Sequence, residues 1–371
     1  MAGMNVQQDK LLNRLKVAGR ILTNKRIALL DDNFLRVIES NGGLYFISAG
    51  EGHFLMQEVV ERANGGNEDT QELCIEYGKF VAPASELEES ICLTPTEDSL
   101  KVQSGNIQLS FNGYQGESLV EKLQEMQTQY QKVKETGVKL SRKDFVDTLS
   151  YLHGLRDKEA DGDLQDVYLT TEKSFVASPR FAVRMDYSIP VNFGLDRDTS
   201  DVLMNLLSMS EEEEFYILID GNTLHVAVGK DIYQTDSVNT TIKNVNELFQ
   251  SFQADVSFPM VKSEFVRYVR LATLFTESDE DILLTVKEGQ GRIQSDSDGE
   301  TGGASSGTFS VPSEVQDLEI TVNGDDVQSV FSGLGNGAGQ EIDLKLALDL
   351  ELGYFRHNKG DCLLSIRNLE L

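Results

Sequence analysis

The side chains best suited to acid–base or metal chemistry are scattered along the sequence. The four histidines lie far apart: His53, His153, His225 and His357. The three cysteines are equally isolated: Cys74, Cys92 and Cys362. No CxxC, HExxH or Walker motif is present. We therefore expect no bound metal and no cofactor, and we interpret the cysteines as small buried hydrophobic residues in a reducing compartment.

Two short motifs match catalytic patterns by composition alone. Residues 303–307, GASSG, fit GxSxG, but they lie in a Gly- and Ser-rich stretch and not between a strand and a helix. Residues 333–338 fit GxGxxA, yet they follow a predicted helix and do not open one. The acidic pairs at 31–32 and 325–326 suit a surface turn and a helix start better than a Mg²⁺ site. The sequence thus predicts a protein that is not an enzyme.

Length and charge narrow the possible classes of protein. The chain has 371 residues, 40% of them hydrophobic, and a formal net charge of −28. This length exceeds one ordinary hydrophobic core and suits two to three domains. There is no run of about eighteen apolar residues and no apolar segment at the N-terminus, so we expect no membrane span, no signal peptide and a cytoplasmic location. The acidity opposes nucleic-acid binding unless the basic residues are clustered.

One order of elements recurs along the chain. Residues 258–298 predict a helix with one apolar and one basic face, followed by a strand, a tight turn and a returning strand. The predicted helices span residues 7–22, 83–91, 142–155, 200–209, 262–274 and 325–334, with short strands between them. The pattern forms an internal repeat of roughly 120 residues, which indicates a symmetric or solenoidal architecture.

The repeats divide the chain into three predicted domains and one connector. We place the domains at residues 1–115, 138–250 and 251–371, with a connector helix within 116–137. The connector carries an apolar stripe that includes Leu123 and Met126, which we interpret as packing onto a sheet in preference to forming a partner site. Residues 299–307 predict a flexible loop.

Several short runs make the chain resemble the bacterial-type DNA sliding clamp, the β subunit of the replicative DNA polymerase III. RLATLF at 270–275 precedes ILLTVKEGQGRIQSDSDGETGGA at 282–304, in the order seen where the last domain of that family begins. The ending CLLSIRNLEL and the runs LYFISAG and SFVASPRFAVRM match further points of the repeats. The resemblance covers essentially the whole chain and indicates a divergent member, with a bacteriophage origin left open.

The resemblance implies an α+β fold of three repeated clamp domains, with antiparallel sheets outside and helices lining a central hole. Two chains would close a ring, so the expected state is a homodimer. Such a processivity factor encircles double-stranded DNA without sequence preference. It tethers the DNA polymerase, and polymerase and clamp loader bind it through short hydrophobic peptides. Two alternatives stay open: a repeat-built scaffold protein of a virion, and a metal-dependent enzyme of nucleic-acid metabolism.

The first helix of each repeat is basic. The net charge is +3 over residues 7–22 and +2 over both 139–158 and 262–274. The residues expected to contact DNA are Lys10, Arg14, Arg20, Lys25, Arg26, Arg142, Lys143, Arg267 and Arg270. Lys25 and Arg26 follow the first helix, where the family places a DNA-touching arginine. The alternative, that these side chains belong to solvated helix faces, stays open.

The resemblance also implies a peptide groove. In the family it is formed by a loop and strand of the second domain, the connector to the third domain, and the C-terminal strand. The matching residues are Ser178, Pro179, Arg180, Phe181, Ile242, Val245, Ile366, Arg367 and Leu369. Arg367 stands where the family has an apolar residue, which indicates a preference for an acidic anchor. The alternative is that Phe181, Val183, Ile366 and Leu369 are core residues.

Overall fold

The computed structural model describes residues 3–28, 33–61, 70–88, 90–114, 117–156, 166–241, 245–276, 281–295, 305–332, 340–357 and 359–369. The chain forms two compact units: unit 1 within residues 1–149 and 195–240, and unit 2 within residues 150–194 and 241–371. Both contain antiparallel sheets and helices, so the predicted α+β class is confirmed. The predicted domain boundaries stay predictions.

Unit 1 contains two antiparallel sheets. The smaller has the order β1–β6–β7–β8, formed by Met4–Gln7, Ser90–Pro95, Ser99–Ser104 and Ile107–Asn112. The larger has the order β5–β2–β3–β4–β16–β15–β14–β9. Its strands are β2 Phe34–Ser40, β3 Gly43–Gly50, β4 His53–Glu61, β5 Gln71–Glu76, β9 Val138–Ser141, β14 Glu214–Asp220, β15 Thr223–Val228 and β16 Asp231–Thr235. Through the pairing of β4 with β16, the first and second predicted repeats share one sheet.

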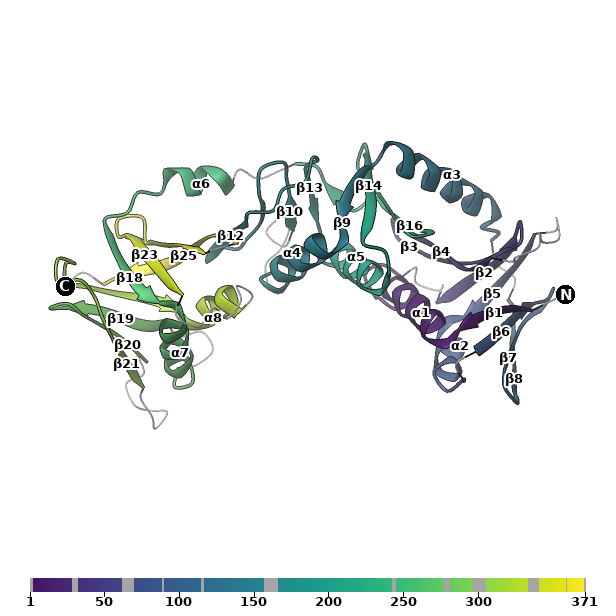
Figure 1. Ribbon diagram of the computed structural model, residues 1–371, viewed down its shortest axis with the longest axis horizontal. Helices are drawn as coiled ribbons and strands as arrows, with labels where there is room; N and C mark the ends of the chain where they lie inside the picture. The colour runs from purple at the N-terminus through teal and green to yellow at the C-terminus, as the bar shows by residue number, and fades with distance from the viewer. Residues whose placement is uncertain are drawn as a thin grey trace. The chain divides into compact units, whose positions relative to one another are not determined.

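Helices lie on both faces of this larger sheet (Figure 1). One face carries α1 (Gln8–Leu22) and α5 (Arg197–Met209), which pack together, with α2 (Tyr77–Ala84) beside α1. The helix α4 (Arg142–Gly154) follows β9 directly. Leu11, Leu15 and Ala18 of α1 are buried in one core with Phe46 and Phe80. Their helical spacing explains why this segment is a helix with a single apolar stripe.

The helix predicted at residues 83–91 is wrong. The observed helix α2 ends at Ala84 and contains Pro83 near its end, while strand β6 begins only a few residues later. Tyr77, Phe80 and Ala84 are buried at helical spacing, whereas the residues of β6 alternate between buried and partly exposed positions. The prediction took Pro83 for a helix start. It overlooked the helical spacing of apolar residues before Pro83 and the strand-like alternation after it.

The connector helix packs as predicted. It is α3 (Val120–Thr136), and it lies on the face of the larger sheet opposite α1 and α5 (Figure 1). Leu123, Met126 and Val133 are buried with side chains of β2, β3, β4, β15 and β16. The Tyr130 hydroxyl donates a hydrogen bond to the carbonyl oxygen of Gly229. The apolar stripe therefore covers the sheet.

Unit 2 is built around a sheet with the order β10–β11–β12–β25–β22–β19–β20–β21, and β24, β23 and β18 continue from β25. The strands are β10 Val167–Leu169, β11 Ser174–Ala177, β12 Phe181–Met185, β18 Val256–Val261, β19 Asp281–Lys287, β20 Gln290–Ser295, β21 Ser306–Ser310, β22 Leu318–Asn323, β23 Glu341–Ala347, β24 Leu352–His357 and β25 Gly360–Asn368. Two further short strands are β13 Phe193–Leu195, which spans the sequence boundary between the units, and β17 Val238–Asn239, which belongs to the residues of unit 1. The long strand β25 pairs with β12, β24 and β22 and so joins the second predicted repeat to the third.

The sheet of unit 2 also has helices on two sides. α6 (Val245–Ser251) packs on one face of β11, β12 and β25, while α7 (Lys262–Thr273) and α8 (Gly324–Ser332) lie together on the other side (Figure 1). Phe331 of α8 stacks on Phe355 of β24, with ring centroids 4.3 Å apart. No helix in the described parts of either unit combines the length and hydropathy needed to cross a membrane.

Candidate functional site

Four of the predicted DNA-contacting residues are exposed on and after α1. Lys10 and Arg20 lie on its solvent side, and Lys25 and Arg26 form the turn that follows. Asn24 shapes this turn, because its side-chain oxygen accepts a hydrogen bond from the backbone N–H of Arg26 at 3.0 Å. Its amide nitrogen donates to a carboxylate of α5 at 2.9 Å. The four cations are therefore available to a polyanion.

Arg14 is engaged inside unit 1. Its guanidinium forms an ion pair with Asp231 of β16, and both side chains are largely buried. Burial raises the pKa of Asp231 to about 6, against the opposing effect of Arg14. Contact between Arg14 and DNA stays a prediction, and this ion pair argues against it, because a phosphate would have to displace a buried partner.

Arg142 caps a helix end. Its guanidinium donates hydrogen bonds to the carbonyl oxygens of Leu207 and Glu212, at the C-terminal end of α5. Free carbonyls at this end of a helix favour a cation. Lys143, the next residue, is exposed, so this pair divides into one structural and one available cation. Glu211, in the segment that follows α5, has a carboxylate oxygen 3.7 Å from the Lys10 ammonium nitrogen.

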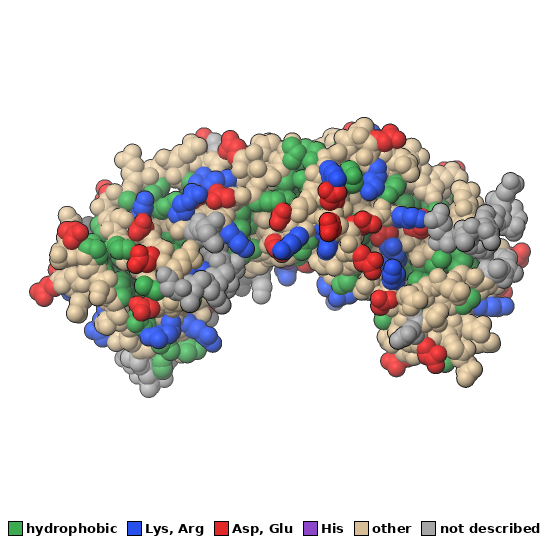
Figure 2. Space-filling model, in the orientation of Figure 1, with side chains coloured by type: hydrophobic (Ala, Val, Ile, Leu, Met, Phe, Trp, Pro, Cys, Tyr) green, Lys and Arg blue, Asp and Glu red, His purple; other side chains and the backbone are tan. Residues whose placement is uncertain are grey.

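Helix α7 supplies the last two predicted cations. Arg267 and Arg270 are both exposed, and the Arg267 guanidinium lies 5.1 Å from the centroid of the Tyr268 ring. Beside them, Leu271 is 43% exposed and Leu274 is 69% exposed. Figure 2 shows basic and hydrophobic side chains together over α7, whereas acidic and basic side chains are mixed over α1 and α5. Helix α7 therefore presents apolar as well as basic surface.

The turn predicted to border the peptide groove is well defined. The Ser178 hydroxyl oxygen accepts hydrogen bonds from the backbone N–H groups of Arg180 and Phe181, both at 3.2 Å. The backbone N–H of Ser178 donates to the carbonyl oxygen of Phe181 at 2.8 Å. The Arg180 side chain reaches Asp326 at the start of α8, at 3.0 Å. Pro179 at the tip stays exposed.

The remaining predicted groove residues divide between two faces of the sheet. Phe181 pairs with Leu364 on β25, and Ile366, two residues further, shares the face of Leu364. Val245 of α6 packs instead with Leu363, on the opposite face. The sheet therefore separates Val245 from Phe181 and Ile366.

The other predicted groove residues lie near the end of β25. Arg367 and Leu369 are exposed. The backbone N–H of Leu369 donates a hydrogen bond to the backbone carbonyl oxygen of Glu319. Ile242 lies outside the described residues. Of the predicted set, these two exposed residues and the turn at 178–180 are the parts open to a ligand.

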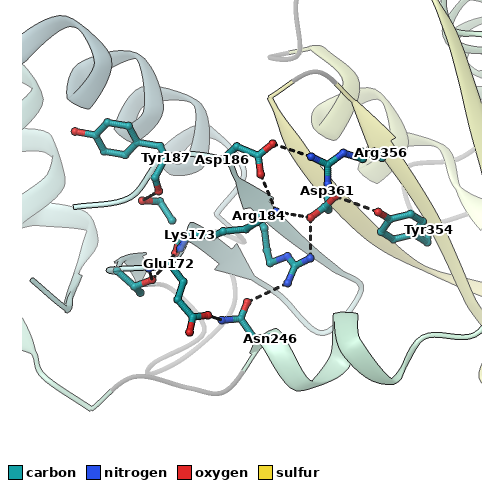
Figure 3. Close-up of polar contacts among 11 residues, drawn as sticks. Glu172, Lys173, Arg184, Asp186, Tyr187, Asn246, Tyr354, Arg356 and Asp361 are labelled. Atoms are coloured by element: carbon teal, nitrogen blue, oxygen red, sulfur yellow. Dashed lines mark hydrogen bonds and ion pairs between the residues drawn. The ribbon is translucent and has the colours of Figure 1, made fainter. Parts of the chain in front are cut away.

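A buried charge cluster that the sequence analysis missed lies at the start of β25 (Figure 3). Asp361 of β25 is fully buried and accepts hydrogen bonds from Lys173 at 2.8 Å and Arg184 at 2.7 Å. The Tyr354 hydroxyl and the Arg356 guanidinium, both on β24, each donate to it at 3.0 Å. The cluster thus connects the β11–β12 hairpin to β24 and β25. Its only sequence signal is an acidic residue at the start of an apolar strand.

The cluster keeps Asp361 ionised. Burial alone would raise the pKa of Asp361, but the hydrogen bonds from Lys173, Arg184 and Tyr354 lower it to about 2. Arg184 also donates to Asn246 of α6 at 3.1 Å, so the same guanidinium helps to hold that helix on the sheet. The described residues contain no group of three His, Cys, Asp or Glu side chains placed to bind a metal ion.

Comparisons place this fold among known structures. No family model and no curated protein matches the sequence. The DNA polymerase III beta subunit of Thermotoga maritima is 12% identical, with a TM-score of 0.77. A Pseudomonas aeruginosa sliding clamp solved with griselimycin is 13% identical, with a TM-score of 0.78. A Helicobacter pylori beta clamp solved with a DNA ligase peptide is 14% identical, with a TM-score of 0.74. In each case 100% of both chains is covered.

The chain therefore has the fold of the DNA polymerase III beta sliding clamps over its full length. The resemblance predicted from short sequence runs is confirmed at the level of the fold. A fold alone does not fix a function, because function depends on particular surfaces.

The Asp361 cluster gives a first testable prediction. Replacing Asp361 by Asn should lower the free energy of unfolding by about 3–5 kcal/mol, because three cations lose their shared buried carboxylate. Urea denaturation at pH 7 measures this change. Asp349→Asn, at an exposed position, is the matched control. Equal stability of the two variants would contradict the assigned role.

The stability difference between wild type and Asp361→Asn should depend on pH. The pKa of Asp361 in the folded state, about 2, lies below the ordinary value of about 3.9 expected in the unfolded chain. Ionised Asp361 therefore stabilises the fold above about pH 4, and this contribution is lost as pH falls through 2. The stability difference between wild type and Asp361→Asn should shrink over that range, and a constant difference down to pH 2 would argue against it.

Proposed function

We propose that this protein is a DNA sliding clamp, a processivity factor that encircles duplex DNA and tethers a DNA polymerase. The observation that carries the proposal is the match to sliding clamps over the full length of both chains, at TM-scores of 0.74 to 0.78. Exposed cations on α1 and α7 support it, because a clamp needs contact with phosphates and no readout of bases. A cytoplasmic location belongs to the same proposal.

Ring closure by two chains is part of this proposal. Strand β8 stands at the end of the order β1–β6–β7–β8, and β21 stands at the end of the order that runs through β19 and β20. Each has one strand partner among the described residues. Exposed edges of this kind favour pairing with another chain. Ile107 on β8 is 39% exposed, and Leu274, directly after the helix α7 that packs on β20 and β21, is 69% exposed, so both add exposed apolar area.

A homodimer is therefore the expected state in solution. Its mass would be twice the 41.2 kDa of one chain. Ile107→Asp combined with Leu274→Asp should convert it to monomers at micromolar concentration, because burying either carboxylate in an apolar interface is unfavourable. Mass photometry checks the mass. Leu350→Asp, at an exposed leucine outside both edges, should leave the dimer intact. A wild-type monomer or trimer would contradict the proposal, and filaments or shells in electron micrographs would favour a scaffold protein.

Contact with DNA is expected to be weak and electrostatic. Reversing Lys25 and Arg26 to Glu should reduce binding to duplex DNA and shorten polymerase runs, with the effect largest at low salt. The slope of log K against log salt should fall by about two, close to one unit for each lost phosphate contact. Lys101→Glu with Lys287→Glu, two exposed cations on strands β7 and β19 and outside the predicted set, is the control. An unchanged slope would exclude an inner-surface role for Lys25 and Arg26.

The peptide-binding part of the proposal rests on the exposed end of β25. We propose that Arg367 favours partner peptides with an acidic anchor. A labelled hydrophobic peptide that carries Asp should bind about tenfold more tightly than its Asn counterpart, since a charged hydrogen bond is worth roughly 1.5–3 kcal/mol. Arg367→Ala should remove this preference, whereas Arg292→Ala, an exposed arginine on β20, should not. Fluorescence anisotropy measures the affinities for the Asp and Asn peptides. If wild type, Arg367→Ala and Arg292→Ala all preferred the Asp peptide equally, the groove would lie elsewhere.

A further inference from the structure

A cavity of about 390 Å³ lies within unit 1, between α1, α5 and the β4–β16 strand pair. It therefore sits where the sheet of the first predicted repeat continues into the second. Ligand pockets have volumes of roughly 300–1,000 Å³, whereas a single buried water needs only about 10–15 Å³. The cavity is large enough to receive side chains of a partner.

The floor of the cavity contains an unsatisfied polar group. Gln57 of β4 is 1% exposed, and its side-chain oxygen accepts no hydrogen bond from any residue that the structure describes. Because Met56 pairs with Ile232, the next residues along the two strands, Gln57 and Asp231, are neighbours on the other face of the sheet. An unsatisfied buried acceptor costs about 1–3 kcal/mol. Gln57 lines the cavity, so a rotation of its side-chain amide would present this oxygen to a ligand N–H group.

The charged groups around the cavity leave an excess of acid. Asp231 is already satisfied, because it accepts hydrogen bonds from Arg14 and from the backbone N–H of Glu58. Asp9 and Glu212 at the rim form no ion pair with any described residue. Counting all the side chains that line the cavity, five are acidic and three are basic, which leaves a formal charge of −2. The rim therefore attracts a cation.

Apolar side chains form part of the walls of the cavity: Val17 of α1, Leu206 and Met209 of α5, Val59 of β4 and Val228 of β15. Val59 and Met209 are partly exposed, whereas the other three are buried. Side chains of this kind bind an aliphatic group of similar size, at a gain of roughly 25 cal/mol per Å² of apolar surface buried. A ligand that fits must therefore combine an aliphatic group with a positively charged N–H donor.

We propose that this cavity binds a partner peptide that presents a lysine or arginine beside a leucine-sized aliphatic side chain. The ammonium or guanidinium donates to the side-chain oxygen of Gln57 and lies near Asp9 and Glu212, while the aliphatic side chain enters between α1 and α5. The site involves unit 1 alone. It is distinct from the region around Arg367 and does not depend on ring closure or on DNA.

Methionine-methyl NMR on the full chain tests the proposal. The chain has eight methionines, of which Met209 lines the cavity, while Met260 lies in unit 2 and serves as the reference. The probe is the pentapeptide acetyl-Gly-Leu-Lys-Leu-Gly-amide. We expect a saturable shift of the Met209 signal and none at Met260. Replacing the lysine of the probe by glutamine, or both leucines by serine, should each weaken binding at least about tenfold.

Two variants separate this site from general attraction of cations to an acidic protein. Gln57→Leu should weaken binding of the probe about tenfold, because the probe loses its hydrogen-bond acceptor. The same change should raise the melting temperature, because it removes a buried unsatisfied acceptor. Asp9→Asn with Glu212→Gln should weaken the probe without changing the melting temperature. Glu121→Gln with Glu213→Gln removes the same charge from exposed positions outside the cavity and should leave the affinity unchanged.

Three results would overturn the proposal. The serine-containing probe could bind as tightly as the original, which would mean simple charge attraction. The probe could shift Met56, which lines a separate hollow beneath α3, and not Met209. Gln57→Leu could stabilise the protein without affecting affinity, which would make Gln57 a purely structural defect.

Discussion

Antiparallel pairing between strands of successive repeats is the interaction on which the rest of the structure depends. β4 pairs with β16 in unit 1, and β12 pairs with β25 in unit 2, so each sheet continues past the end of one predicted repeat. A continued sheet has two faces that must both be covered or solvated. Helices α1 and α5 cover one face in unit 1 and α3 covers part of the other. Strands β8 and β21 stand at the ends of their own strand orders, and each has one strand partner among the described residues, so their edges favour pairing with another strand.

Each of these pairings has a buried aspartate beside it, and the two aspartates are compensated differently. Asp231 at the β4–β16 pairing has one cation, Arg14, and burial raises its pKa to about 6. Asp361 at the β12–β25 pairing is buried too, yet hydrogen bonds from Lys173, Arg184 and Tyr354 lower its pKa to about 2. The number of hydrogen-bond donors decides whether the pKa of the buried aspartate rises or falls, because each hydrogen bond to the carboxylate offsets part of the lost hydration. The β12–β25 pairing is accordingly an electrostatic connection, while at the β4–β16 pairing the effect of burial on Asp231 outweighs that of its single ion pair.

Local periodicity predicted most elements and failed where tertiary contacts decide. The stripe of α3, the apolar face of α7 and the turns at Asn41-Gly42 and Glu288-Gly289 follow from residue spacing and from the positive φ angles that these turns require. The 83–91 helix was wrong because a proline was weighted above the burial pattern around it. The strands β1 and β24 and the helix α6 are short and carry little signal of their own. The Asp361 cluster was not predictable, since its partners lie just before β11, on β12 and on β24, and meet only after folding.

The structure also sorts the predicted cations by what they are bonded to. Arg14 and Arg142 have the same charge as their neighbours on α1 and α4, but one is paired with a buried carboxylate and the other caps α5. Sequence spacing cannot separate these roles, because both residues lie on basic helices. The cations left exposed, such as Arg20 and Lys25, are fewer than the sequence suggested, and acidic side chains lie among them. For the proposed clamp, few and partly neutralised cations predict weak, salt-sensitive contact with phosphates, which is the kind of contact that lets a protein remain on DNA and still move along it.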